Sequence, residues 1–354
     1  LPWQFVVNPK LVEANKGSDD GQDYLRKTIA GSGHFVIKRA EPGNLYEFER
    51  AAKPWKAGGN LDGAIWKIVR ETASQRLMVG RGEAHIAVDL TSEDMAALKD
   101  RPGINLILEP EYRTFSIKMN TEHGPLADIN LRKAISYAFN YQGMLDSAGY
   151  AQLMNGPLPA GLSVDPNLKV YRTNLELAKQ FLAKSKYPNG GIKLTMVHVT
   201  GLEQQRQWAL VMLDSLKKLN IELDIKPTVW PDMVASTKTP ATTADFFPVY
   251  QTANYADPDN IAFAAYHSSR NGGWQNPVYK NPKIDELIEK GRAEIDPKKR
   301  AAIYAEFERT VVEDAPDIFG VLEKRRLAVR SEVLNLVFTP VASNAIDMLN
   351  ISLK

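Results

Sequence analysis

The sequence predicts an α/β protein made of two lobes. Its 354 residues are enough for about two domains at the usual ~150 residues per domain. Strand patterns dominate both ends of the chain, whereas the middle alternates strands with helices. We therefore expect 1–117 and 320–354 to share a β-rich first lobe and 118–319 to form an α/β second lobe. The crossings near Ser116 and Ile318 are the expected hinge.

The first third carries strand signals in close succession. Phe35 and Ile37 alternate with Val36 and Lys38 before the turn at 41–44. Tyr46 and Phe48 alternate with glutamates after it, and this pattern is typical of a β-hairpin. The elements expected next are a strand at 65–69, a helix at 72–78, a strand at 85–89, a helix at 92–99 and two strands flanking the turn at 109–111.

A strand–helix–strand pattern in the middle is the most informative local signal. Apolar residues alternate at 192–196, recur at helical spacing over 202–219 and alternate again at 221–225. This predicts a βαβ unit with parallel strands, and a further strand at 245–250 follows it. Ligands bind beyond the carboxyl ends of such strands. Those ends are expected at 198–201, 228–230 and 251–255.

Capping signals place the remaining helices. Asp128 is expected to start a helix that continues through Gly143 or beyond, and Thr173 with Glu176 forms a predicted capping box. Asp296 followed by proline predicts the start of the last helix. The final helices are expected at 282–293 and 297–312.

Charge and cysteine content exclude several function classes. The 44 basic and 42 acidic residues leave a net charge of +2 without a long basic run, so nucleic acid is not an expected partner. No stretch of 18 or more apolar residues exists. The absence of cysteine excludes disulfides, thiolate metal sites and cysteine nucleophiles. It also favours an exported, periplasmic protein, although the first residues do not resemble a signal peptide.

Residues with catalytic patterns are sparse. The five histidines lack metal-ligand spacing, and 30–33 lacks the first glycine of a nucleophile elbow. Asp257 and Asp259 could act as paired carboxylates, but their Asp-Pro-Asp-Asn setting favours a turn and a helix cap. We therefore expect no enzyme activity, no cofactor, no metal and no catalytic residue.

Aromatic and amide residues gather instead at the predicted strand ends. Such side chains combine apolar faces with neutral hydrogen-bonding groups, which suits an uncharged or mixed ligand. Trp208 is excluded because it lies in the buried stripe of a helix. The predicted ligand-binding residues are Arg113, Phe115, Trp230, Tyr250, Gln251, Asn254, Tyr255 and Trp274.

Several segments together resemble the family 5 solute-binding proteins of ABC importers, the dipeptide- and oligopeptide-binding type. The match is specific because the segments occur in family order over nearly the whole chain. They lie at 31–35, 41–43, 125–128, 131–135, 155–159, 178–179, 253–260, 276–277 and 284–287.

The resemblance implies a periplasmic-binding-protein-like fold in which two hinged lobes close around a peptide or peptide-like solute. It also implies a monomer that delivers this solute to ABC permease subunits in the membrane. Two alternatives stay open: a non-peptide solute such as a sugar, an opine-like compound or another small molecule, and, on the same scaffold, a hydrolase.

The chain departs from the family pattern in two ways. Family members carry a long N-terminal portion, so the first lobe is expected to be incomplete here. Peptide binders of the family place an acidic residue where Asn254 stands, and a tryptophan is common at the position of Gln251. A neutral amide forms no charge-assisted bond with an α-amino group, so ligands without a free ammonium should be accepted.

Overall fold

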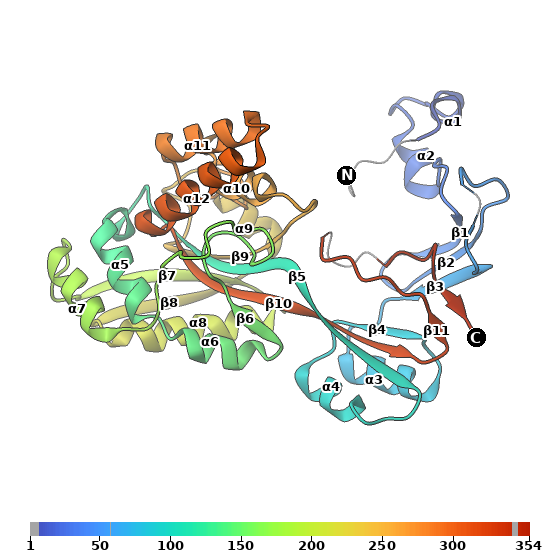
Figure 1. The fold of residues 1–354 in the computed structure, drawn as a ribbon, viewed down its shortest axis with the longest axis horizontal. Coiled ribbons are helices and arrows are strands. Elements are labelled where there is room, and N and C mark those ends of the chain that lie inside the picture. Colours follow the sequence, from blue (N-terminus) through green and yellow to red (C-terminus); the bar gives the residue numbers. More distant parts are fainter. Residues whose placement is uncertain (1–6, 57, 342–345) are drawn as a thin grey trace. The chain divides into compact units, whose positions relative to one another are not determined.

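The structure is a computed structural model of mixed α/β character. It describes residues 7–56, 58–341 and 346–354. The described strands form a three-stranded, a seven-stranded and a two-stranded sheet. These sheets and the helices around them are labelled in Figure 1.

The chain divides into two compact units, each described by itself. The terminal unit comprises Leu1–Glu109 with Arg325–Lys354, and the middle unit comprises Pro110–Lys324. Two long strands, β5 (Ile104–Met119) and β10 (Asp317–Arg330), contribute residues to both units. The expected lobe boundaries at 117/118 and 319/320 lie inside these strands, and a hinge there stays a prediction.

Short strands and helices make up the terminal unit. Its elements, besides the ends of β5 and β10, are α1 (Pro9–Ala14), α2 (Gln22–Lys27), β1 (Phe35–Glu41), β2 (Leu45–Arg50), β3 (Gly63–Lys67), α3 (Thr72–Arg81), β4 (Ile86–Val88), α4 (Ser92–Leu98), β11 (Val333–Leu334) and β12 (Ser352–Leu353).

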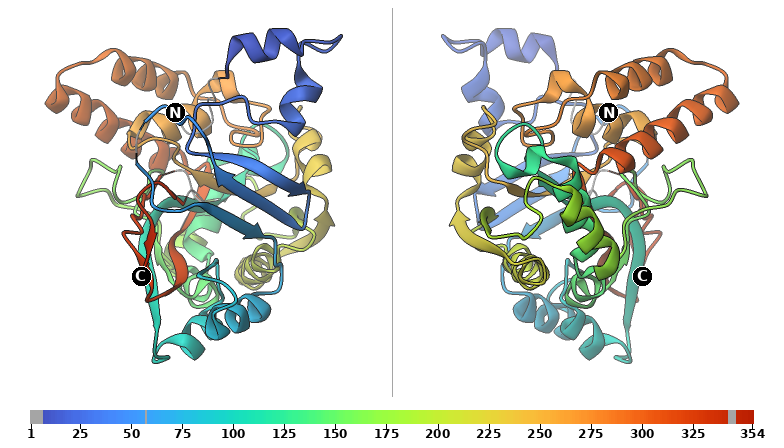
Figure 2. Two further views of the ribbon diagram at one scale, coloured as in Figure 1. Left: turned by 90° about the vertical axis from the view of Figure 1, so that its right-hand side faces the viewer. Right: turned by 90° about the vertical axis from the view of Figure 1, so that its left-hand side faces the viewer.

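The predicted hairpin is confirmed in this unit. Antiparallel β1 and β2 meet at the pair Glu41–Leu45, and β3 adds to β2 as a third strand (Figure 2). The turn needs Gly43, whose φ of 81° lies in the left-handed region. The helices expected at 72–78 and 92–99 are present as α3 and α4.

The middle unit alternates strands with helices. Its elements, besides parts of β5 and β10, are η1 (Pro125–Ala127), α5 (Ile129–Ala138), α6 (Tyr141–Ala148), β6 (Ala151–Leu153), α7 (Leu175–Lys184), β7 (Ile192–Val199), α8 (Glu203–Lys217), β8 (Ile221–Thr228), α9 (Trp230–Ser236), β9 (Phe246–Thr252), α10 (Pro258–Tyr266), η2 (Ser268–Arg270), α11 (Pro282–Ala293) and α12 (Pro297–Asp314).

The predicted βαβ unit is confirmed. Strands β7 and β8 are parallel and paired along their whole length, from Ile192–Ile221 to Val199–Thr228. Strand β9 lies on the other side of β7, parallel to it, and pairs antiparallel with β5. Gly190 has to be glycine because a Cβ there would lie 2.2 Å from the Leu219 carbonyl oxygen.

Helices cover both faces of this sheet. On one face Trp208, Met212 and Leu216 of α8 recur every four residues and are fully buried, as their spacing predicts. The helices α10, α11 and α12 lie on the opposite side of the sheet (Figure 1). The core of the middle unit therefore has two layers separated by the sheet.

A buried ion pair joins the two long strands. The Lys118 Nζ of β5 lies 2.7 Å from the Asp317 Oδ2 of β10, and the Tyr266 hydroxyl donates to the same oxygen at 2.7 Å. The Lys118 ammonium also sits 4.1 Å from the centroid of the Tyr266 ring. Burial lowers the pKa of Lys118, and the Asp317 carboxylate opposes that shift. Both side chains are at most 4% exposed, so removing one partner leaves the polar group of the other buried without it.

One expectation for β5 is wrong. Two strands were expected around the turn at 109–111, but β5 runs unbroken from Ile104 to Met119. A proline disturbs a strand where its missing N–H would have donated to a neighbouring strand. The pairing of β5 with β9 begins beyond Pro110, at Arg113. Pro110 therefore interrupts no bond to β9.

Two helix signals were also misassigned. The helix that starts at Asp128 ends at Ala138, because Asn140 caps a separate helix by accepting a bond from the Gly143 N–H. The next N-cap is Asn174 rather than Thr173. The Thr173 hydroxyl instead donates to the Phe139 carbonyl at 2.5 Å. Helix α9, which lies between the βαβ unit and the strand expected at 245–250, was missed.

We predict that Lys118→Met lowers the free energy of unfolding by about 3–5 kcal/mol, because the buried Asp317 loses its cation. Urea denaturation of the wild type and the variant measures this loss. Lys290→Met is the matched control: Lys290 pairs with Glu286 at 2.6 Å, but both side chains are about 60% exposed. This substitution should leave the free energy of unfolding nearly unchanged, because water screens the exposed pair. Equal losses for the two variants would contradict the prediction.

Candidate functional site

The carboxyl ends of three parallel strands define the candidate site. Strands β7, β8 and β9 end at Val199, Thr228 and Thr252. The chain leaves each strand toward the same edge because the three run in the same direction. The expected position of the strand ends is therefore confirmed, and the predicted binding residues can be placed relative to them.

The pleat of the sheet separates these residues into two groups. Phe115 pairs with Tyr250, and Arg113 pairs with Thr252, so Arg113, Phe115 and Tyr250 project from one face. We call this the α8 face, because Trp208 of α8 packs on it. Gln251 projects from the opposite face, which we call the α9 face.

On the α8 face the predicted residues form an aromatic cluster with tilted rings. Phe115 is 0% exposed and lies between Trp208 and Tyr250, with ring centroids 3.8 and 4.8 Å away. The Arg113 guanidinium sits 4.5 Å above the Tyr250 ring and 3.6 Å from Glu323. Phe115 therefore supports Tyr250 from below and offers no surface of its own.

On the α9 face two tryptophans meet. Trp230 begins α9 and is 42% exposed, and its ring lies edge-to-face with Trp274 at 5.6 Å. Trp274 packs against a cluster that includes Met233 and Phe247. Gln251 is buried, and its Nε2 donates to the Gln275 carbonyl at 3.1 Å. Gln251 thus acts on the neighbouring turn rather than on open space.

The two remaining predicted residues lie in the turn after β9. The Asn254 N–H donates to the Asn260 Oδ1 at 2.9 Å, which fixes the backbone of the turn. The Tyr255 hydroxyl donates to Asp259 at 3.1 Å. Burial raises the pKa of Tyr255, and Asp259 adds to that effect. Tyr255 therefore stays a neutral donor at ordinary pH.

The structural interpretation of the Asp-Pro-Asp-Asn motif is confirmed. Asp257 caps α10 by accepting from the Asp259 N–H, and Arg300 of α12 contacts both Asp257 oxygens at 2.8 Å. The hydrogen bonds to Asp257 raise the pKa of Arg300. Asp259 lies 3.4 Å from Arg292. Both carboxylates thus hold the turn in place.

Three contributors were missed from the sequence. Gln204 accepts the Tyr250 hydroxyl at 3.0 Å, and Gln275 receives the bond from Gln251. His198 is buried at the end of β7, and its Nδ1 has no hydrogen-bond partner among the described residues. Gln204 was detectable, because it lies in the first turn of the helix that follows β7. The contribution of Gln275 is made by its backbone, which leaves no sequence signal.

The arrangement is suited to binding. It combines aromatic faces, carboxamides and hydroxyls with one arginine that Glu323 partly neutralises. Within 7–56, 58–341 and 346–354, no group of three or more acidic or histidine side chains is placed to hold a metal ion. Among the same residues, no helix is both long and apolar enough to cross a membrane.

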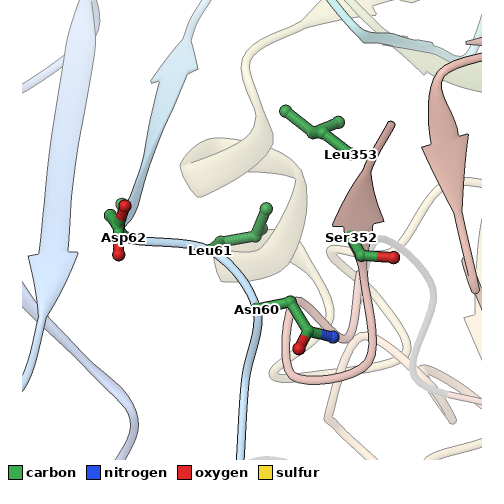
Figure 3. A pocket seen from close by; sticks show the side chains of 6 residues that line it. Asn60, Leu61, Asp62, Ser352 and Leu353 are labelled. Atoms are coloured by element: carbon green, nitrogen blue, oxygen red, sulfur yellow. The ribbon is translucent and has the colours of Figure 1, made fainter.

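A separate pocket lies in the terminal unit. Asn60, Leu61, Asp62 and Gly63 line it from the segment that leads into β3, and β12 supplies its other wall (Figure 3). None of its lining residues belongs to the predicted set. It also lacks an aromatic ring, so it does not match the chemistry expected of the site.

The chain is similar to known proteins along most of its length. The model of the bacterial extracellular solute-binding proteins, family 5 Middle, matches residues 3–273. The probable D,D-dipeptide-binding periplasmic protein DdpA of Escherichia coli K12 is 26% identical over 352 residues, which cover 97% of this chain and 66% of DdpA. Heme-binding protein A of Haemophilus influenzae is 23% identical and is covered to 53%, against 81% of this chain.

A solved structure shares the fold. The periplasmic binding protein DppA of Helicobacter pylori, in complex with the peptide STSA, superposes with a TM-score of 0.86 at 21% identity, covering 98% of this chain and 68% of that one. The chain thus spans about two thirds of DdpA and about half of heme-binding protein A. The match of the family model over most of the sequence establishes the family. This chain belongs to family 5 of the bacterial extracellular solute-binding proteins.

Proposed function

We propose that this chain belongs to the solute-capturing subunit of an ABC importer and that it binds a peptide or peptide-like solute. The subunit carries out no catalysis and hands the solute to permease subunits in the membrane. It works as a periplasmic monomer. Family membership supports capture of an extracellular solute, and the names of DdpA and of the STSA complex support a peptide-like ligand.

One observation carries the proposal. The carboxyl ends of β7, β8 and β9 are followed by aromatic and amide side chains, and several of these are fixed by bonds from elsewhere in the middle unit. Fixed neutral donors and aromatic faces recognise amide groups and apolar side chains without a cost of ordering at the moment of binding. A peptide presents both kinds of group.

We assign the ligand contacts of the middle unit to those predicted residues whose side chains are at least partly exposed to solvent. Tyr250, Tyr255, Trp230 and Trp274 offer ring surface, and Asn254 offers the turn after β9. Arg113 offers a cation that is already shared with Glu323, so it favours a carboxylate or a carbonyl oxygen. Phe115 and Gln251 act from beneath these residues.

A non-peptide solute is the second candidate. Asn254 brings no negative charge to the turn after β9, so nothing at this position requires an ammonium group. Heme-binding protein A shows by its name that a relative of this chain takes a ligand other than a peptide. An opine-like compound or a sugar derivative with neutral donors and acceptors would satisfy the same groups.

Thermal unfolding tests the function. We expect a bound solute at about 100 times its Kd to add about 2.7 kcal/mol to the free energy of unfolding, because it binds only the native state. This corresponds to a rise in Tm of about 4 °C for a chain of this length. The panel consists of Ala-Ala, Ala-Phe, their N-acetylated forms, a sugar and an opine. Tyr250→Ala should weaken the shift, and Trp66→Ala in β3 should leave it unchanged. A panel without any shift would contradict solute capture.

Calorimetric titration tests the role of Asn254. Asn254→Asp should favour the free dipeptide over its N-acetylated form by about tenfold relative to the wild type, because the new carboxylate pairs with an ammonium and is unpaired beside a neutral ligand. Asn140→Asp adds the same charge at the N-cap of α6 and is the control. If the ratio of the two affinities stays the same in Asn254→Asp, Asn254 only holds the turn and lies outside the site.

A further inference from the structure

The turn that carries Trp274 is held by buried polar side chains from three directions. Gln251 of β9 donates to the Gln275 carbonyl at 3.1 Å, and Thr237, at the end of α9, donates to the Gly272 carbonyl at 2.9 Å. Asn276 donates to the carbonyl of His267 at 3.1 Å. Gln251, Thr237 and Asn276 are each at most 2% exposed. The position of the turn is therefore determined by its surroundings.

Burying a carboxamide costs free energy, because its polar groups lose their hydrogen bonds to water. A leucine or methionine at position 251 would pack in the sheet without a polar group to satisfy. The Nε2 of Gln251 instead donates a hydrogen bond to the carbonyl of Gln275, the residue directly after Trp274. The bond therefore fixes the position of the backbone next to Trp274, which an apolar side chain at position 251 would not do.

The two tryptophan rings touch edge to face and together offer a partly exposed apolar surface. Their planes meet at 69°, and Trp230 is 42% exposed. Trp274 packs against a buried apolar cluster of Val199, Met233, Phe247 and Val249. A flat or bulky apolar group placed on this surface gains contact with both rings. A cation over the same rings would gain a cation–π attraction but lose part of its hydration, so a lysine side chain is the competing ligand.

We propose that Gln251 is a positioning residue: through Gln275 it sets Trp274 against Trp230, and this tryptophan pair selects solutes that carry an aromatic or bulky apolar side chain. The proposal rests on the proposed function, since it takes the strand ends as the solute site. It goes further by naming the class of side chain that is preferred and the residue that organises the preference.

Calorimetric titration with three dipeptides tests the proposal: Ala-Phe, Ala-Ala and Ala-Lys. The wild type should bind Ala-Phe about tenfold more tightly than Ala-Ala, and Trp274→Ala or Trp230→Ala should abolish this preference. Trp66→Ala removes a tryptophan of similar exposure from the terminal unit and should leave the preference unchanged.

Gln251→Met tests the positioning role, because methionine keeps the length of the side chain and removes the N–H donor. The preference for Ala-Phe should fall several-fold, while the affinity for Ala-Ala should change little. Hydrogen exchange of the amides at 272–276 should become faster in the same variant. Gln75→Met is the control: the Gln75 side chain likewise bonds the backbone, at Val69 and Val88 of the terminal unit.

Each result decides between the two claims. Binding of all three dipeptides with equal affinity, or a preference for Ala-Lys, would overturn the selection by the tryptophan pair and leave solute capture intact. A preference that survives Gln251→Met would overturn the positioning role alone. If none of the dipeptides binds the wild type, both the selection and the peptide part of the proposed function fail.

Discussion

The contact between Lys118 and Asp317 constrains how β5 and β10 lie against each other. It joins β5 to β10 inside a region that water does not reach, so neither side chain can leave without stranding the other charge. The register of β9 is set against β5, and the position of Tyr250 depends on that register. Lys118 itself is paired with Phe247 of β9, so the ion pair lies on the strand whose register with β9 places Tyr250.

The alternation of side chains along β9 gives neighbouring residues separate tasks. Tyr250 packs against Phe115 on the α8 face, and Gln251 points to the opposite face, where it bonds the turn that bears Trp274. A β-strand at the edge of a site can therefore organise the surfaces above and below it at once. In this protein one side supplies a cation–aromatic contact and the other supplies a partly exposed apolar surface.

Local periodicity predicted much of the fold. The β7–α8–β8 unit and the burial of Trp208 follow from apolar spacing, and the capping role of Asp257 follows from its turn motif. The break at Asn140 was missed because the apolar spacing continues across it.

The site was predicted as a set of residues but not as two groups. Tyr250 and Gln251 are neighbours in a strand, so their side chains point to opposite faces of the sheet. This alternation was available in the sequence, but the residues at the strand ends were predicted as one group. The bond from Gln251 to Gln275 involves a backbone carbonyl, and Arg300 lies far along the chain from Asp257. Contacts of this kind depend on tertiary structure, so local sequence patterns do not reveal them.

The bidentate contact between Arg300 and Asp257 has a consequence for how such a protein diversifies. The turn after β9 takes its position from a helix that has no part in the strand-end cluster. Natural variation in α12 can therefore retune recognition while every residue at the strand ends stays the same. Comparisons of solute preference between homologues that consider only the lining residues would overlook this source of change.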